Sequence, residues 1–113
     1  MDYRRELLKG STETLLLSLL KNEPMYGYQI IKELEKRSQG YFRFREGTLY
    51  PALHRLEATG LIRGNWERHA SGKKRRYYRL TEKGLEWLEA KVAEWWGFSS
   101  AVNMVTRPTV SQA

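Results

Sequence analysis

The residues in this chain best suited to chemistry are cations gathered in one short segment. Between residues 62 and 79 the sequence has seven basic residues and a single acidic one, Glu67. The segment therefore carries six of the seven net positive charges of the 113-residue chain. Ammonium and guanidinium groups this close repel one another unless an anion relieves them, and nucleic-acid phosphates bind such groups. The basic residues are Arg63, Arg68, Lys73, Lys74, Arg75, Arg76 and Arg79.

Composition leaves two kinds of anionic partner open, a nucleic acid and an anionic membrane surface. The membrane is disfavoured, because no basic amphipathic helix is present and no run approaches the roughly 18 apolar residues needed to span a bilayer. The chain has no cysteine, which excludes a disulfide framework and a thiolate metal site. The N-terminal residues lack the apolar segment of a signal peptide, so we expect a cytoplasmic protein.

The histidines and glycines form no catalytic pattern. His54 and His69 are the only histidines, they fall in different predicted elements, and neither lies at a metal-ligand spacing or beside a nucleophile motif. The glycines are scattered over turns and helix ends and form no phosphate-binding loop. We therefore expect no catalytic residue, no metal and no cofactor, and a protein that is not an enzyme.

Hydrophobic periodicity predicts three helices before the basic segment. Apolar residues recur at three- and four-residue spacing over residues 3–20, 26–38 and 48–59. Gly40 is suited to the left-handed end of the second helix, and Gly60 closes the third. The three helices supply the apolar faces of a small core.

The third predicted helix presents a polar outer face. Pro51 fits this helix if Gly47 or Thr48 caps it, because the proline then lies in the first turn, where its missing N–H has no intrahelical partner. Most of the outward groups can hydrogen-bond a base edge or a phosphate. The alternative interpretation is that these residues form a solvated helix face without a partner. The outward residues are Thr48, Tyr50, Pro51, His54 and Arg55.

After Gly60 the hydrophobic period changes from 3.6 to 2, which predicts two short strands over residues 62–67 and 77–80. Residues 70–73 supply the turn between them. The basic residues then lie at the tip and on the return strand of a β-hairpin. Trp66 of the hairpin and Trp87 farther along are expected to be ordinary packing residues.

Three helices followed by a basic two-stranded hairpin is the order of a winged helix-turn-helix, in which the third helix enters the major groove and the hairpin, or wing, touches the DNA backbone. Four wing residues join the outward residues of the third helix as DNA-binding candidates. They are Gly72, Lys73, Lys74 and Arg76.

A last helix is predicted from an N-cap at Thr81, with Glu82 in its first turn, to about residue 105. It carries a heptad-like apolar seam, which favours a homodimer, although packing against the chain's own first helix is an alternative. The dimer candidates are Leu8 of the first helix and the seam residues Leu85, Leu88, Val92, Trp95, Ser99 and Val102.

We therefore expect a mainly α fold with a small β-hairpin. A winged helix-turn-helix domain would occupy residues 1–80, a dimerisation helix residues 81–105, and a polar, disordered tail residues 106–113.

The adjacent indoles of Trp95 and Trp96 can sandwich a flat aromatic ligand near a two-fold axis, with Val92 and Ser99 beside them. They can equally be anchors of the dimer interface.

Several motifs together resemble the PadR-type transcriptional regulators. They are Tyr26-Gly27-Tyr28, Gly47-Thr48-Leu49-Tyr50-Pro51-Ala52-Leu53, Arg55-Leu56-Glu57, Gly60-Leu61-Ile62 and Arg76-Tyr77-Tyr78-Arg79-Leu80-Thr81-Glu82. The single C-terminal helix resembles the shorter branch of the family, which includes multidrug-sensing members.

The resemblance implies a homodimeric repressor that binds a pseudo-palindromic DNA site and is released by a small aromatic or drug-like effector. It implies that Tyr26 or Tyr28 lies near the DNA backbone. Trp95 falls where multidrug-sensing members hold a drug between tryptophans, and Trp96 beside it departs from that pattern. The alternative is a regulator without a small-molecule pocket, controlled by its own abundance or by a partner protein.

Overall fold

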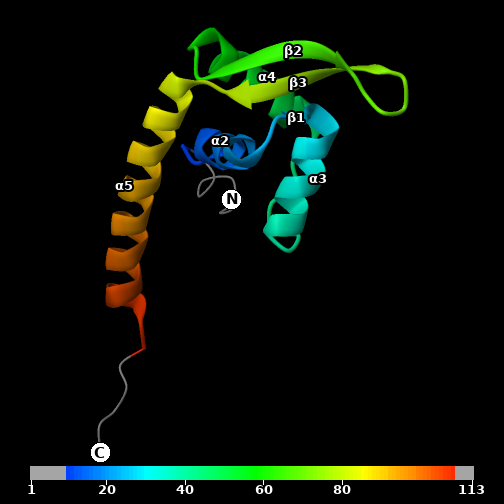
Figure 1. Cartoon of the computed structure of the whole chain (residues 1–113). Coiled ribbons are helices and arrows are strands. Elements are labelled where there is room, and N and C mark those ends of the chain that lie inside the picture. Colours follow the sequence, from blue (N-terminus) through cyan, green and yellow to red (C-terminus); the bar gives the residue numbers. More distant parts are fainter. Residues whose placement is uncertain (1–9, 109–113) are drawn as a thin grey trace, which may run out of the picture.

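The computed structural model of the chain describes residues 10–108 (Figure 1). In this part of the chain the expected mainly α fold with a small basic hairpin is confirmed. Four helices are joined by three short strands. In chain order the elements are α2 (Thr12–Asn22), β1 (Met25–Tyr26), α3 (Gly27–Arg37), α4 (Glu46–Ala58), β2 (Ile62–Arg68), β3 (Lys74–Leu80) and α5 (Glu82–Thr106).

Helix α2 begins later than the sequence pattern predicted. The prediction of one helix over residues 3–20 is wrong at its middle, because Gly10 has a φ of 86° and α2 starts only after the N-cap Ser11. A left-handed glycine interrupts a right-handed helix. The first part of the predicted helix, including the dimer candidate Leu8, lies outside the described residues.

The sheet has one strand more than the predicted hairpin. The strand order is β1-β3-β2, and both pairings are antiparallel. Strand β1 contributes only Met25 and Tyr26, which pair with Tyr78 and Tyr77. A two-residue strand has no alternation to detect, so the sequence pattern missed it. It joins the start of α3 directly to the base of the wing.

Helix α4 begins earlier than predicted, with Arg45 at the N-cap and Glu46 as its first residue. The expectation that Pro51 lies in the first turn is therefore wrong, since the proline is inside the helix. Without a proline N–H the carbonyl of Gly47 has no donor four residues on, and the exposed position leaves that carbonyl to water. The acidic Glu46 complements the positive end of the helix dipole.

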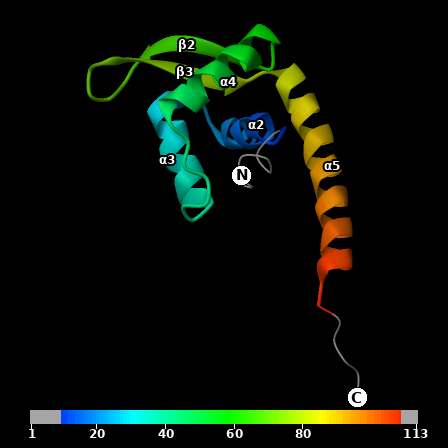
Figure 2. The same cartoon turned by 180° about the vertical axis from the view of Figure 1, so that it is seen from behind.

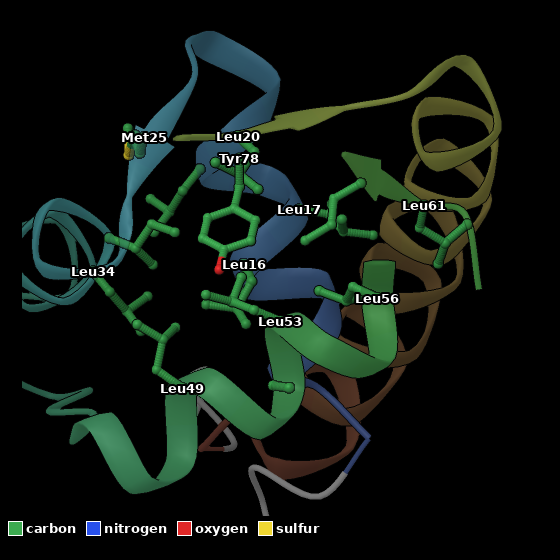
Figure 3. Close-up of a cluster of buried hydrophobic side chains, with 14 of the residues drawn as sticks. Leu16, Leu17, Leu20, Met25, Leu34, Leu49, Leu53, Leu56, Leu61 and Tyr78 are labelled. Atoms are coloured by element: carbon green, nitrogen blue, oxygen red, sulfur yellow. The ribbon is translucent and has the colours of Figure 1, made fainter. Parts of the chain in front are cut away.

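The core lies between the sheet and helices α2, α3 and α4. Figure 3 shows Tyr78 of β3 surrounded by leucines of α2 and α4. Leu16, Leu17, Leu49 and Leu53 are completely buried. Burial raises the pKa of the Tyr78 phenol above its ordinary value.

Helix α5 leaves this core along one side of the molecule (Figures 1 and 2). Thr81 is its N-cap, as predicted, and the Thr81 Oγ1 accepts a hydrogen bond of 3.0 Å from the backbone N–H of Gly84. Only the first part of α5 is packed against the domain, where Leu88 is buried and Trp87 covers the core. The prediction that Trp87 is a packing residue is confirmed.

Candidate nucleic-acid interface

Helix α4 has the predicted polar outer face. Four of its five predicted outward residues are freely exposed, while Leu49, Ala52, Leu53 and Leu56 bury the opposite side in the core. Arg55 lies at the edge of this face toward α2, where its Nε is 3.8 Å from the Glu13 carboxylate. An exposed ion pair of this length is weak, so the guanidinium remains available to an anion. The freely exposed residues are Thr48, Pro51, His54 and Arg55.

The fifth outward residue, Tyr50, is only just exposed because its ring lies over the first turn of α3. A methyl group at Gly27 would collide with the Tyr50 hydroxyl and ring. Gly27 therefore allows α4 to approach the N-terminus of α3 closely. The phenol braces the two helices against each other, and one edge of it faces outward.

The tip of the wing is a tight, exposed loop. The backbone N–H of His69 donates to the Lys73 carbonyl at 2.7 Å, and the N–H of Gly72 donates back to the His69 carbonyl at 2.8 Å. Gly72 has a φ of 90°, a conformation that glycine adopts without strain. Lys73 and Lys74 are exposed beside it, and within residues 10–108 neither forms an ion pair. The predicted turn at residues 70–73 is confirmed.

The two tyrosines near the start of α3 lie in different surroundings. Tyr26 supports the wing: its ring packs edge-on against Tyr77 and His69, and the Arg75 guanidinium is 5.1 Å from its centroid. Tyr28 is instead 57% exposed on α3. Of the two, Tyr28 has the freer hydroxyl.

Residues 16–90 match the sequence profile described as the transcriptional regulator PadR-like family. The chain is a member of the PadR-like family. A PadR-like transcriptional regulator from Bacillus cereus is 35% identical in its crystal structure, with a TM-score of 0.83 over 92% of this chain and 99% of that chain. A transcriptional regulator from Clostridium thermocellum is 30% identical, with a TM-score of 0.80 over 90% of this chain and 99% of that one.

A curated transcriptional regulator of Mycobacterium tuberculosis is also similar, with 35% identity over 80 residues, 71% of each chain. PadR-like regulators bind DNA and are not enzymes, so the predicted class of partner and the absence of an enzymatic function are confirmed. Over residues 10–108 no helix is long and apolar enough to span a membrane.

Two basic residues of the PadR wing are paired with carboxylates. Arg76 reaches α4, where its Nη2 is 2.7 Å from Glu57 Oε2. Arg79 forms an ion pair with Glu67 across the hairpin. Of the seven basic residues between residues 62 and 79, these two already have anionic partners inside the protein, and Arg76 is one of the predicted DNA ligands.

Trp66 is a residue that the sequence pattern misplaced. It was expected to pack in the interior, and that is wrong, because its side chain is 65% exposed on β2, opposite Arg76 on β3. Alternating residues of a strand are buried only where the strand lies over the core. The hairpin extends beyond the core (Figures 1 and 2), so the alternation no longer predicts burial at Trp66. Ile62 is buried and Gly64 half-buried before the side chains become exposed.

The predicted dimer seam of α5 divides into two parts. Leu88 is buried and Leu85 and Val92 are half-buried in the chain's own domain. Farther along, Trp95 is 52% exposed and Val102 is exposed as well. The first part of the seam therefore packs within the chain, in line with the alternative prediction that α5 packs against its own domain. The second part presents apolar surface to solvent.

Three of the four candidate effector residues, Trp95, Trp96 and Ser99, lie on this second part, while Val92 belongs to the part that packs internally. Trp95 packs against Phe98, with ring centroids 6.0 Å apart and an angle of 39° between the rings. Trp96 is exposed on another side of α5, since consecutive helical residues point about 100° apart. The half-buried Ser99 donates from its Oγ to the Trp96 carbonyl at 3.4 Å. The two indoles of one chain thus do not face each other.

Proposed function

We propose that this PadR-like regulator is a homodimeric, sequence-specific repressor that binds a pseudo-palindromic DNA site. The observation that carries the proposal is the exposed polar face of α4 beside a wing whose exposed tip holds Lys73 and Lys74. The helix would read base edges in the major groove, and the wing would neutralise phosphates. Because its proposed partner is DNA, we place the repressor in the cytoplasm.

Each predicted contact except Arg76 has a direct role in this proposal. Thr48, His54 and Arg55 face the bases or the adjacent phosphates, while Pro51 shapes the helix surface between them. Tyr28, Tyr50 and the backbone at Gly72 lie where the DNA backbone passes, and Tyr26 supports the wing. Two copies of α4 would occupy successive major grooves, with half-sites centred about 10 base pairs apart.

The first expected result is a salt-dependent footprint on DNA upstream of the chain's own gene. If each protomer neutralises three to five phosphates, the logarithm of affinity should fall with the logarithm of salt concentration with a slope of about −5 to −9 for the dimer. Fluorescence anisotropy at several salt concentrations measures this slope. A slope near zero, or equal affinity for the footprinted and random DNA, contradicts sequence-specific binding.

The second expected result concerns the dimer. Trp95, Phe98 and Val102 recur at the spacing of a helix seam and are exposed in the single chain, so a second copy of α5 is the partner we propose for them. Replacing Val102 with glutamate would bury a charge in that interface and convert the dimer to a monomer in analytical ultracentrifugation.

Ser100 provides the matched control, because it lies about 160° around the helix from Val102. Ser100→Glu should leave the dimer intact. A monomeric wild-type chain at micromolar concentration, or a Val102→Glu chain that still sediments as a dimer, would contradict the assignment of this surface.

The third expected result concerns the effector. We propose that a planar aromatic compound binds between Trp95 side chains of the two protomers, with Val92, Trp96 and Ser99 nearby, and shifts the spacing of the DNA-binding units. Such a compound should quench tryptophan fluorescence, and Trp95→Ala should remove that change while Trp66→Ala should not. If no planar compound acts through Trp95, control by abundance or by a partner protein is favoured.

A further inference from the structure

We propose that Glu57, Gly64 and Arg76 form a clasp that fixes the wing to α4, and that Arg76 is a positioning residue rather than a phosphate ligand. This inference rests on the proposed function, because it concerns how α4 and the wing are held in one orientation toward DNA. It replaces the expectation that Arg76 binds DNA directly.

One oxygen atom joins α4 to both strands of the wing. Oε2 of Glu57 accepts a hydrogen bond of 3.1 Å from the backbone N–H of Gly64 on β2. The same atom accepts a bond of 2.7 Å from Nη2 of Arg76 on β3. A carboxylate near the end of α4 therefore holds each strand of the hairpin at the place where the hairpin leaves the core.

Gly64 makes room for the arginine. A Cβ at this position would lie 2.6 Å from Nε and 2.8 Å from Cζ of Arg76, so any other residue here would displace the guanidinium from its observed path across β2. On β3 the Arg76 Cζ is 5.8 Å from the ring centroid of Tyr78. The strand, the aromatic ring and the carboxylate together restrict the guanidinium to one path.

Burial makes this pair stronger than an ordinary surface ion pair. The side chains of Arg76 and Glu57 are 33% and 30% exposed, less than any other ion-paired partners in the described residues except Glu33. A charge-assisted hydrogen bond that water screens only in part restrains geometry well. The pair also spans 19 residues of sequence, so it restrains two elements that no short loop ties together.

The local charges also argue against Arg76 as a phosphate ligand. If Arg76 turned toward DNA, the Glu57 carboxylate would lose its cation beside an approaching phosphate, and the Gly64 N–H would be its remaining partner. Lys73 and Lys74 at the wing tip need break no ion pair within residues 10–108 to bind phosphate. Those two residues can therefore contribute counterion release without that cost.

The two roles of Arg76 predict opposite effects of removing Glu57. If Arg76 binds phosphate, Glu57 competes for it, and Glu57→Ala raises DNA affinity. If the clasp positions the wing, Glu57→Ala lowers affinity by about tenfold or more, because both charged hydrogen bonds that hold the wing strands to α4 are lost. Arg76→Ala should then leave the slope of affinity against salt unchanged.

A direct readout does not depend on DNA. Because the Gly64 N–H donates to Glu57, its exchange with deuterated solvent in the free protein, followed by NMR, should accelerate at least tenfold in Glu57→Ala. The matched control is Glu67→Ala, which breaks the other carboxylate–arginine pair of the hairpin but no bond to α4. Gly64 exchange should stay near the wild-type rate in that variant.

Distinct outcomes separate this inference from the proposed function. Unchanged Gly64 exchange in Glu57→Ala, higher DNA affinity in that variant, or a salt slope reduced by about 0.9 per protomer in Arg76→Ala would overturn the clasp. Failure of the wild-type protein to bind any DNA would overturn the proposed function and leave the exchange result to decide the clasp. Should Glu57→Ala not fold, the isosteric Glu57→Gln removes the charge but keeps an acceptor oxygen. Gly64 exchange should then accelerate less than in the alanine variant, and a rise in DNA affinity would still overturn the clasp.

Discussion

Replacing Lys73 and Lys74 together with alanine is expected to weaken DNA binding on the order of 10³-fold near 0.1 M salt. The dimer would lose four phosphate contacts, each of which contributes about 0.9 to the slope of log affinity against log salt. Both side chains are exposed at the tight wing tip formed around Gly72, so their removal should leave the fold intact. Fluorescence anisotropy across a salt series measures the slope and the affinity together.

The matched control removes two lysines far from the wing tip. Lys36 near the end of α3 and Lys91 on α5 give a double alanine variant with the same loss of charge. This variant should bind DNA with nearly the wild-type slope. If it loses as much slope as the wing variant, general charge rather than the wing accounts for binding. An unchanged slope in the wing variant would remove the tip from the interface.

Gly84→Ala is expected to destabilise the fold by about 3 kcal/mol, with a fall in Tm of roughly 10 °C. A Cβ at Gly84 would collide with the Leu61 carbonyl oxygen and lie 2.8 Å from a methyl group of Leu80. The carbonyl cannot move easily, because it accepts bonds of 3.1 Å from both the N–H and the Oγ1 of Thr81. The first turn of α5 would have to shift away from the wing.

Gly97→Ala is the matched control on the same helix. No atom lies within 4 Å of a Cβ at Gly97, so alanine should stabilise α5 by about 1 kcal/mol through its better helix propensity. Thermal unfolding followed by circular dichroism compares the two variants. Equal stability of Gly84→Ala and Gly97→Ala would show that the close approach of α5 to Leu61 does not constrain the fold.

Local patterns in the sequence were enough for most of the elements. Helices α3 and α4 bury apolar residues at three- and four-residue spacing, and the hairpin pairs Ile62 with Leu80 as period-2 alternation predicts. Thr81 was recognisable as an N-cap because capping depends on residues only three positions apart. Such features are encoded within one or two turns of chain, so no distant contact is needed to predict them.

The predictions of local structure were wrong where a distant contact or a single backbone angle determines the secondary structure. Strand β1 forms only because β3 lies beside it, and the left-handed Gly10 interrupts the span that periodicity predicted as one helix. Pro51 lies inside α4 because the helix starts at Glu46, and its exposed position tolerates the missing hydrogen bond. Each outcome depends on neighbours in space that spacing along the chain does not reveal.

The basic composition of residues 62–79 and the order of the elements were sufficient to predict a winged-helix DNA-binding protein, because charge and periodicity are properties of the chain itself. Which cations remain available to DNA was decided by packing. Arg76 is held by Glu57 from 19 residues away, while Trp66 extends beyond the core, and the apolar seam of α5 is buried only as far as the domain reaches. Burial and pairing depend on which surfaces meet, and that is a property of the folded molecule.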